Sequence, residues 1–456
     1  MTLFAFLLAL GVLITAHEWG HYRVAVACGV KVLRFSIGFG HPLLRWKSRH
    51  PRAGQDTEFC IGLIPFGGYV KMLDEQDGEI SSSDLPMSFQ RQALWARAAI
   101  VAAGPVANLL LAVCLYTVTF WLGQYESQAV LSTPVAGSLA EQAGLRSGDV
   151  VLRAGASIDD LKDVASLEAL RGWVIQQGDA PLDMEVRSPG KATSHVLHLS
   201  ALPEEAITPG SNPWQARGLT GAWSRPVIGE VQAGSPASLA GLKRGDEVLR
   251  IEGRVVNDAI ALRTMVRASG QHVAPAKQTW EIARGHERLH IEVQPQQVLE
   301  GQQHMGRIGA QVGETPATVW VQLGVWDGVV QAIDKTWHVM GMTIDMLGRL
   351  LTGQASLDQL SGPIGMADYA GRSADLGLGP YLSYLALLSI SLGVFNLLPF
   401  PMLDGGHLLY YLYEACTGHP PSAAWLDVMQ RVGLVVLVVL MVFSLFNDVV
   451  RLGWLP

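Results

Sequence analysis

Four stretches of the chain are apolar for long enough to cross a membrane as helices. A spanning helix needs about 20 mostly apolar residues at a rise of about 1.5 Å each. Residues 3–28 and 98–122 meet this requirement, and residues 380–403 are uncharged and long enough. Residues 432–446 are short, but the span lengthens if the Arg431 side chain reaches the membrane surface. The pattern predicts transmembrane segments at 1–28, 98–122, 380–412 and 428–450.

Basic residues indicate how these segments are oriented. Cytoplasmic loops carry an excess of Lys and Arg, so the connection between the first two spans is predicted to be cytoplasmic. Both termini and the long segment between spans two and three then lie outside. The first span has no basic residue before it and no small-x-small site after it, so it does not resemble a cleaved signal peptide. The basic residues are Lys31, Arg34, Arg45, Lys47, Arg49, Arg52, Lys71, Arg91 and Arg97.

The long external segment contains a repeat. AGSLAEQAGLRSGDVVLR at 136–153 recurs as AGSPASLAGLKRGDEVLR at 233–250, an offset of 97 residues. This period suits two tandem domains, predicted at 126–218 and 222–312, better than a solenoid. In each copy a Gly-Asp pair reads as a turn leading into a strand. The pattern resembles PDZ domains of bacterial proteases, which bind peptide ends at a sheet edge, although two spacer domains without ligands remain an alternative.

An amphipathic helix is predicted at 318–352, between the second repeat and the third span. Apolar residues recur there in steps of four and three, which places them on one face of a helix. A coiled-coil seam and a core helix are alternatives, but two tryptophans beside a membrane span favour a helix in the membrane interface. The stripe consists of Trp326, Val330, Ile333, Trp337, Met340, Ile344, Leu347 and Leu351.

The composition agrees with a membrane protein. Apolar residues make up 49% of the chain and charged residues 16%, below the roughly 25% of soluble domains. The net charge of −7 and the absence of a long basic run argue against nucleic-acid binding. Four cysteines without a CxxC pair make a disulfide framework or a cysteine zinc site unexpected.

Polar residues interrupt the first span near its end. His17 and His21 are four residues apart, so they share one helix face and can occupy two corners of a tetrahedral zinc site. Glu18 lies one step round the helix, which suits a base that activates water without binding the metal. An ionisable residue in a membrane segment is a functional candidate. The alternative is a polar cluster that water solvates at the end of the span.

A catalytic zinc site requires a third protein ligand, which should come from another span. Asp404 follows apolar residues in NLLPFPMLDGGH at 396–407, where Pro399 and Pro401 break the helix. Along straight helices His17 would lie about 24 Å and Asp404 about 36 Å from the outer surface, at the inner side of a core about 30 Å thick. His407 and Glu414 are rival ligands, and Asp404 is favoured.

These residues together resemble the site-2 protease family of intramembrane zinc metalloproteases. The resemblance implies one Zn²⁺ per chain on His17, His21 and Asp404, with Glu18 as the catalytic base. It also implies that Asn396 helps to hold the substrate. The motifs that carry it are HEWGH at 17–21, FSIGFG at 35–40, IPFGGYVKM at 64–72, AAGPVANLLLA at 102–112, the two repeats, SGPIG at 361–365 and NLLPFPMLDGGH.

The same resemblance implies that residues 29–97 form a cytoplasmic β-structure that enters the membrane. Its edge strand would pair with the substrate through residues that include Gly67, Gly68 and Tyr69. An ordinary cytoplasmic hairpin is the alternative. The expected fold class is therefore a polytopic α-helical membrane protein with four transmembrane helices, a membrane-associated β-structure and two periplasmic α+β PDZ domains.

Substrates and location are also implied by the resemblance. The expected substrates are single-span membrane proteins that have already been cut outside the membrane, including an anti-sigma factor in envelope-stress signalling and remnant signal peptides. The expected location is the inner membrane of a Gram-negative bacterium. The depth of His17 and Asp404 places the active site near the cytoplasmic side of the lipid bilayer, and a monomer is expected because no dimerisation face stands out in the sequence. Two other function classes remain alternatives: a non-catalytic PDZ adaptor, and a zinc carrier, whose polar residues should continue across several spans.

Overall fold

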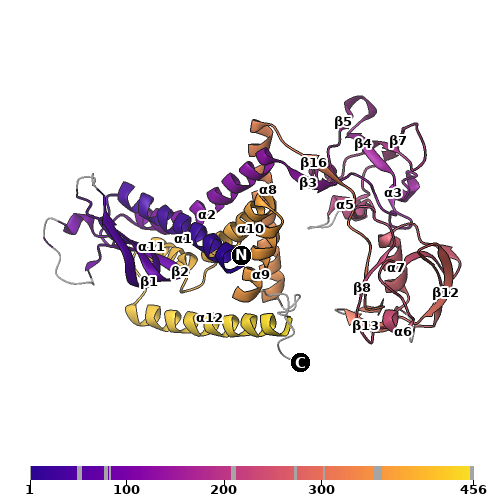
Figure 1. Cartoon of the computed structure of the whole chain (residues 1–456). Coiled ribbons are helices and arrows are strands. Elements are labelled where there is room, and N and C mark those ends of the chain that lie inside the picture. Colours follow the sequence, from indigo (N-terminus) through magenta and orange to yellow (C-terminus); the bar gives the residue numbers. More distant parts are fainter. Residues whose placement is uncertain are drawn as a thin grey trace. The chain divides into compact units, whose positions relative to one another are not determined.

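The computed structural model describes residues 2–48, 54–75, 81, 84–206, 212–271, 275–300, 303–352 and 362–451 (Figure 1). The chain divides into a helical unit, Met1–Gln124 with Gln322–Pro456, and a modular unit, Tyr125–Val321. Arg49, Arg52 and Ser361, which the sequence analysis singled out, lie outside the described residues.

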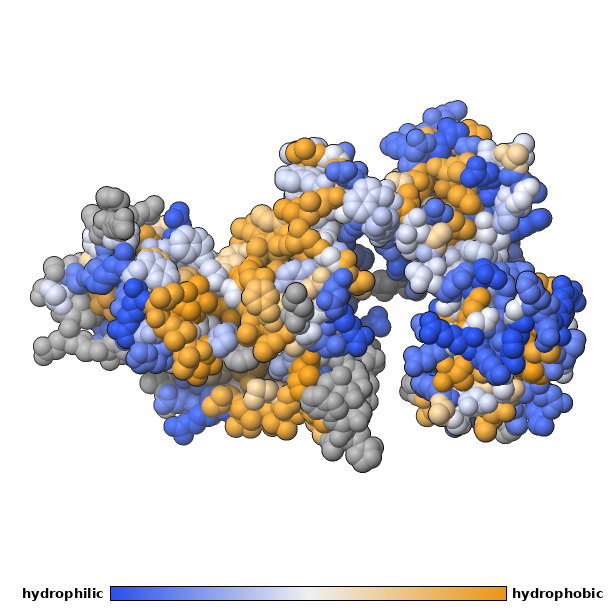
Figure 2. All heavy atoms as spheres, in the orientation of Figure 1, coloured by the Kyte–Doolittle hydropathy of each residue, from blue (hydrophilic) through white to orange (hydrophobic). Residues whose placement is uncertain are grey.

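Four described helices are long and apolar enough to cross a membrane. They are α1 (Thr2–Ala27), α2 (Leu94–Leu122), α10 (Leu378–Leu397) and α12 (Ala423–Arg451). Figure 1 shows α1, α2 and α10 side by side, and Figure 2 shows hydrophobic side chains over much of the visible surface of the helical unit. Lipid would cover such a surface, as the apolar pattern of the sequence predicts.

The third predicted segment, 380–412, is two helices rather than one. Helix α10 ends at Leu397, and α11 (Asp404–Thr417) begins after a turn that contains Pro399 and Pro401. Proline lacks an amide donor and disfavours helix in the residue before it, which explains the break. The straight-helix depth expected for Asp404 is therefore wrong.

Helix α8 (Val325–Leu351) is shorter than the predicted 318–352, because Thr318–Val321 form strand β16, which pairs with β3 (Gln124–Ser127). Its buried face contains Ala332 and Thr336, and Ala332 packs in one hydrophobic cluster with residues of α2 and α10. Most of the predicted apolar stripe is exposed instead, at Trp326, Val330, Ile333, Trp337 and Ile344.

Helix α12 is the least covered of the four long helices and has one buried carboxylate. The two oxygens of Asp448 accept hydrogen bonds from the backbone N–H groups of Gly362 (3.0 Å) and Gly365 (2.8 Å). These groups stand at the start of α9 (Pro363–Asp375). Amide groups in the first turn of a helix have no partner within the helix, so Asp448 both satisfies α9 and holds α12 against it.

Strands β1 (Val32–Lys47) and β2 (Glu58–Met72) form an antiparallel sheet in the helical unit. Both strands bend, so that Phe35 pairs with Val70 on one side and Phe59 on the other. Among the described residues no further strand pairs with this sheet, which leaves its outer segments as edges. Across the sheet the segments follow the order 68–72, 32–37, 58–61 and 42–47.

The modular unit contains two modules with the same strand order, each with its own core. Their sheets run β5-β4-β6-β7 and β10-β9-β11-β12, antiparallel throughout. Equivalent helices are α3 and α6, and α4 and α7, so the sequence repeat is also a structural repeat. The bounds in the first module are α3 (Leu139–Gln142), β4 (Val150–Gly155), β5 (Lys162–Asp163), α4 (Leu167–Gln177), β6 (Leu182–Arg187), β7 (His195–Leu199) and α5 (Pro213–Ala216). In the second they are β8 (Ile228–Val231), α6 (Pro236–Leu239), β9 (Glu247–Ile251), β10 (Arg254–Val255), α7 (Ala259–Ala268), β11 (Gln278–Arg284), β12 (Glu287–Val293), β13 (Gln296–Glu300), β14 (Gln303–Arg307) and β15 (Ala310–Val312).

The repeated Gly-Asp pair closes a turn in both modules. Asp149 accepts a hydrogen bond from the backbone N–H of Arg146, and Asp246 accepts one from that of Lys243, each at 2.8 Å. Burial raises the pKa of Asp246, but hydrogen bonds from Arg284 and Lys243 outweigh this effect and hold it below its ordinary value. The aspartate thus supports the turn that the sequence predicted before each strand.

Asp258 joins the two modules. One carboxylate oxygen accepts hydrogen bonds from the backbone N–H and the hydroxyl of Thr133, both at 2.6 Å, and from the hydroxyl of Ser147. The other oxygen accepts from the N–H of Ala261 at 2.7 Å and so caps α7. Because Asp258 is fully buried, these bonds hold the first module against the start of α7.

Substitution of Asp258 should separate the cap from the link between modules. Asp258→Ser keeps a residue that caps helices well but is too short to reach Thr133, whereas Asp258→Ala loses both roles. In hydrogen–deuterium exchange of the full-length protein, both variants should exchange the Thr133 amide at least about tenfold faster. Only Asp258→Ala should also deprotect the first turn of α7. Wild-type protection of Thr133 in Asp258→Ser would contradict the link.

Candidate metal centre

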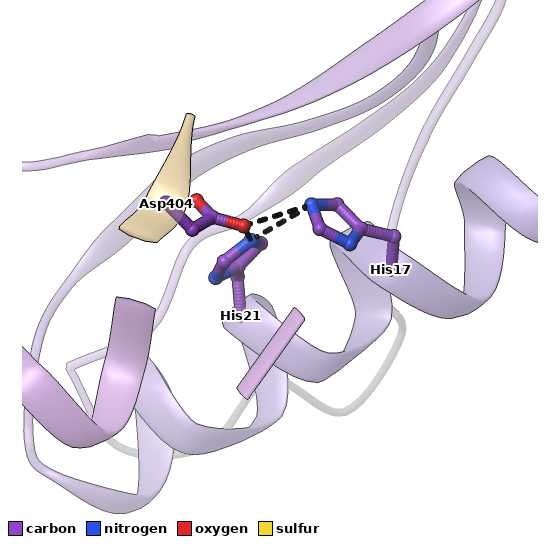
Figure 3. Close-up of side chains that lie close together, drawn as sticks. All are labelled: His17, His21 and Asp404. Carbon is purple, nitrogen blue, oxygen red and sulfur yellow. Dashed lines mark hydrogen bonds and ion pairs between the residues drawn. The ribbon is translucent and has the colours of Figure 1, made fainter. Parts of the chain in front are cut away.

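Three side chains from two helices converge in the helical unit (Figure 3). The Nε2 atoms of His17 and His21 are 3.2 Å apart, and each lies close to Oδ2 of Asp404, at 3.3 Å and 3.5 Å. Within the described part of the chain, these three residues form the one group of histidine, cysteine or acidic side chains that could share a metal ion. Sequence positions far apart therefore meet at one point.

The three atoms fit a zinc ion. Zinc binds histidine nitrogen and carboxylate oxygen at about 2.0–2.1 Å, and a tetrahedron of that size has edges of about 3.3–3.4 Å. The observed separations of 3.2, 3.3 and 3.5 Å match these edges. Oδ2 of Asp404 is buried, and no hydrogen bond reaches it from the described residues, so a cation would satisfy it. The fourth corner of the tetrahedron has no protein ligand in this group.

The histidines point toward Asp404 because α2 contacts their other ring nitrogens. Nδ1 of His21 lies 2.8 Å from the backbone carbonyl oxygen of Ile100, and Nδ1 of His17 lies 3.2 Å from the side-chain amide of Asn108. Both contacts orient the imidazole rings, as supporting residues do at metal sites.

Helices α1 and α2 can approach each other closely because glycines stand at their contact. A Cβ on Gly104 would lie 2.2 Å from Nε2 of His21 and 2.7 Å from Cε1 of His17. A Cβ on Gly20 would lie 2.3 Å from the carbonyl oxygen of Ala103. Small residues let membrane helices pack backbone to backbone, and here they bring α2 within reach of both rings.

Asp404 is placed by a tight turn between α10 and α11. It stands in the first turn of α11, where the helix dipole favours a negative charge. A Cβ on Gly405 would lie 2.2 Å from the carbonyl oxygen of Leu398 and 2.3 Å from that of Leu397. Because the turn folds back on itself, Asn396, which precedes Leu397, comes close to the start of α11. Among the described residues, none is hydrogen-bonded to the side chain of Asn396.

Glu18 lies beside the three-residue group without joining it, and β2 packs against it. A Cβ on Gly68 would lie 2.9 Å from Cγ of Glu18 and 2.8 Å from the carbonyl oxygen of Ser36. The edge segment 68–72 therefore touches the residue predicted to be the base. The next residue, Tyr69, stacks on Phe39, with ring centroids 6.0 Å apart.

Comparisons with known proteins decide the family. The family model of peptidase family M50 matches residues 5–440. The chain belongs to peptidase family M50. The regulator of sigma-E protease RseP of Escherichia coli K12 is 37% identical over 457 residues, which cover 98% of both chains. The RseP of Salmonella typhimurium 14028s is 37% identical over 465 residues, with the same coverage. A protein of Ralstonia nicotianae, named as a candidate zinc metalloprotease, is 38% identical over 463 residues, or 99% of both chains.

As an M50 peptidase with four helices of membrane-spanning length, the protein is an intramembrane zinc metalloprotease. The rival ligands of the sequence analysis lie outside the three-residue group. Glu414 pairs with Arg97 at 2.6 Å, and His407 is exposed beside Tyr410. Asp404 thus remains the third member of the centre in this M50 chain.

Several residues of the M50 site were not predicted. Gly104 and Asn108 lie in AAGPVAN at 102–108, a motif that contributed to the family resemblance but to which no function was assigned. Their spacing of four residues, and an amide in an uncharged span, were the available signals. The carbonyl of Ile100 and the Arg97–Glu414 pair depend on which helices meet, so the sequence offered no signal for them.

Replacement of Asp404 by asparagine should weaken zinc binding, because a neutral amide oxygen is a poorer ligand than a carboxylate. We expect the loss to exceed the roughly 10–100-fold that follows removal of a residue supporting a ligand. Zinc content and affinity of the purified protein in detergent measure this effect. Glu414→Gln is the matched control and should keep its zinc. Full zinc binding by Asp404→Asn, with loss in Glu414→Gln, would reverse the assignment.

Proposed function

We propose that this protease cuts peptide bonds within the transmembrane segments of single-span membrane proteins after a first cut outside the membrane. It would do so with one zinc ion on His17, His21 and Asp404 and with Glu18 as the base. The observation that supports this proposal is the meeting of three ligand atoms from α1 and α11 in a unit of membrane-spanning helices. A soluble substrate would have no need of a site built there.

In this mechanism the side chain of Glu18 moves the proton. Zinc, when bound, supplies Lewis acidity that makes water nucleophilic near neutral pH and polarises a peptide carbonyl. A carboxylate oxygen of Glu18 takes a proton from the attacking water and then delivers it to the amide nitrogen that leaves. Gly68 leaves room for this side chain, because a Cβ there would lie 2.9 Å from Cγ of Glu18.

The substrate strand would lie along the edge segment of β2. A transmembrane helix must unwind before cleavage, and an extended segment can exchange its internal hydrogen bonds for bonds to a sheet edge. Segment 68–72 is such an edge, and Gly68 in it touches Glu18. We therefore assign Gly67, Gly68 and Tyr69 to substrate binding. The side chain of Asn396 has no hydrogen-bond partner among the described residues, and it would form a second contact with the substrate.

The sheet itself would enter the membrane from the cytoplasmic side. Large apolar side chains on β1 and β2 are exposed, where a soluble hairpin would carry polar ones. The exposed stripe of α8 suits the membrane interface in the same way. With the charge pattern of the connections, this supports a multi-pass inner-membrane protein with its termini and modules in the periplasm. The exposed residues of the sheet are Phe39, Leu43, Leu44, Trp46, Leu63 and Ile64.

The two modules would be PDZ domains that restrict access to the site. A cavity of about 620 Å³ in the second module lies between α7 and strands β8 and β15. Its lining includes Arg263 and Arg267 of α7, which suit the carboxylate of a peptide end, and strand backbone that could pair with the peptide. Substrates with large external domains would be excluded until another protease trims them.

The names of the relatives support a role in the control of a sigma factor. Those of Escherichia coli and Salmonella are named as regulators of sigma-E. A membrane anti-sigma factor is therefore the substrate that we propose first, with remnant signal peptides as a second class. The protein would act as a monomer in the bilayer.

Glu18→Gln tests the chemistry. This variant should bind zinc as the wild type does, at about one ion per chain, because Glu18 is outside the ligand set. It should cut a labelled single-span helix without an external domain about 10²–10⁴-fold more slowly, the usual contribution of a general base. Wild-type cleavage by Glu18→Gln would remove Glu18 from the mechanism. Absence of cleavage by the wild type, despite bound zinc, would favour a non-catalytic adaptor.

Deletion of residues 126–312 tests the restriction of access. The deleted protein should cut untrimmed single-span substrates that the full chain leaves intact, while both should cut trimmed substrates. Gel analysis of co-expressed substrates measures this, with Glu18→Gln in the deletion background as the control for other proteases. Intact untrimmed substrate beside cleaved trimmed substrate would show that the modules do not act as a filter.

A further inference from the structure

One face of α2 supports both histidines of the metal centre. Ile100, Gly104 and Asn108 are four residues apart and therefore lie along one line of the helix. Gly104 makes room for the rings. One turn before it, the carbonyl of Ile100 contacts Nδ1 of His21, and one turn after it, the amide of Asn108 contacts Nδ1 of His17. Both Nε2 atoms face Asp404 instead.

The contact with Ile100 determines the tautomer of His21. A backbone carbonyl can only accept a hydrogen bond, so Nδ1 of His21 must carry the proton that it donates at 2.8 Å. The neutral ring then keeps a lone pair on Nε2, which is the atom that faces the centre.

The contact with Asn108 allows two arrangements. If its Nδ2 donates to Nδ1 of His17, the proton of the neutral ring is on Nε2, and no lone pair is left there for a metal. If the amide is turned over, Oδ1 accepts from Nδ1–H and Nε2 is free. The oxygen and nitrogen of a carboxamide occupy nearly equivalent positions, so the partner decides between them. The amide atom that faces away from His17 is buried without a hydrogen-bond partner among the described residues, so only the contact with His17 distinguishes the two arrangements.

We propose that Asn108 is a positioning residue, whose Oδ1 accepts a hydrogen bond from Nδ1 of His17 and thereby makes Nε2 the metal-facing atom. This inference rests on the metal centre proposed above. It also explains why a fully buried amide stands in a largely apolar membrane helix, where a polar side chain is costly. The hydroxyl of Ser389 donates to the backbone carbonyl of Asn108 at 2.7 Å, which supports the backbone at this position and leaves the side chain to His17.

Two substitutions separate the role of acceptor from that of packing. The carboxylate of Asn108→Asp can only accept, whereas Asn108→Leu has a similar size and can neither donate nor accept. We would measure the zinc affinity of the full-length proteins in detergent by competition with a chromogenic chelator. Asn108→Leu should bind zinc about 10–100-fold more weakly than the wild type, and Asn108→Asp should bind it about as tightly. The visible spectrum of Co²⁺ in place of zinc should likewise change only in Asn108→Leu.

Further variants keep the outcomes distinct. Ser389→Ala disturbs the same helix contact without touching the ring, and its zinc affinity should remain that of the wild type. Undiminished affinity in His17→Ala would overturn the metal centre itself. If His17→Ala loses zinc while Asn108→Leu keeps it, only the role of Asn108 is overturned. Should Asn108→Leu not fold, Asn108→Asp still decides, because a tenfold loss there would exclude an acceptor role.

Discussion

The contact between α1 and α2 controls the geometry of the whole site. At Gly20 the backbone of α1 lies so close to α2 that a Cβ would be 2.3 Å from the carbonyl oxygen of Ala103, and at Gly104 the backbone of α2 lies equally close to the imidazole ring of His21. This approach lets a carbonyl and an amide on α2 reach the outer nitrogens of two imidazole rings on α1. The rings could otherwise rotate toward lipid or water. In a membrane helix, close packing therefore supplies the orientation that a polar network supplies in a soluble enzyme.

The arrangement of polar groups at the site reflects the high free-energy cost of leaving such groups without hydrogen bonds in an apolar environment. Several polar groups near the centre have partners on neighbouring helices, as Nδ1 of His21 has in the carbonyl of Ile100 and Arg97 has in Glu414. Oδ2 of Asp404 is buried without a hydrogen-bond partner among the described residues, and the two imidazoles lie next to it. A bound cation at this point would satisfy the carboxylate and draw α11 toward α1, which joins distant parts of the chain.

The sequence predicted those features that depend on local spacing. The interval between His17 and His21, the apolar residues before Asp404 and the repeated Gly-Asp pair could all be read directly, and the structure places them as described. The sequence did not predict features that depend on contacts between distant segments. The double pairing of Phe35, the link at Asp258 and the pairing of Glu414 with Arg97 each require knowledge of which elements meet. The end of α10 at Leu397 was misjudged, because the prolines were recognised while the depth was still calculated along a straight helix.

The distance along the chain between the two halves of the centre affects how the protein is made. Asp404 follows His17 by 387 residues, and Asp448, which caps α9, comes later still. At about 5–20 residues per second, a ribosome needs about 20–80 s to cover this interval. During that time α1 is already made, but the carboxylate of the centre is not. The centre therefore cannot assemble before residue 404 has been synthesised, so the protease stays inactive while most of its chain is made.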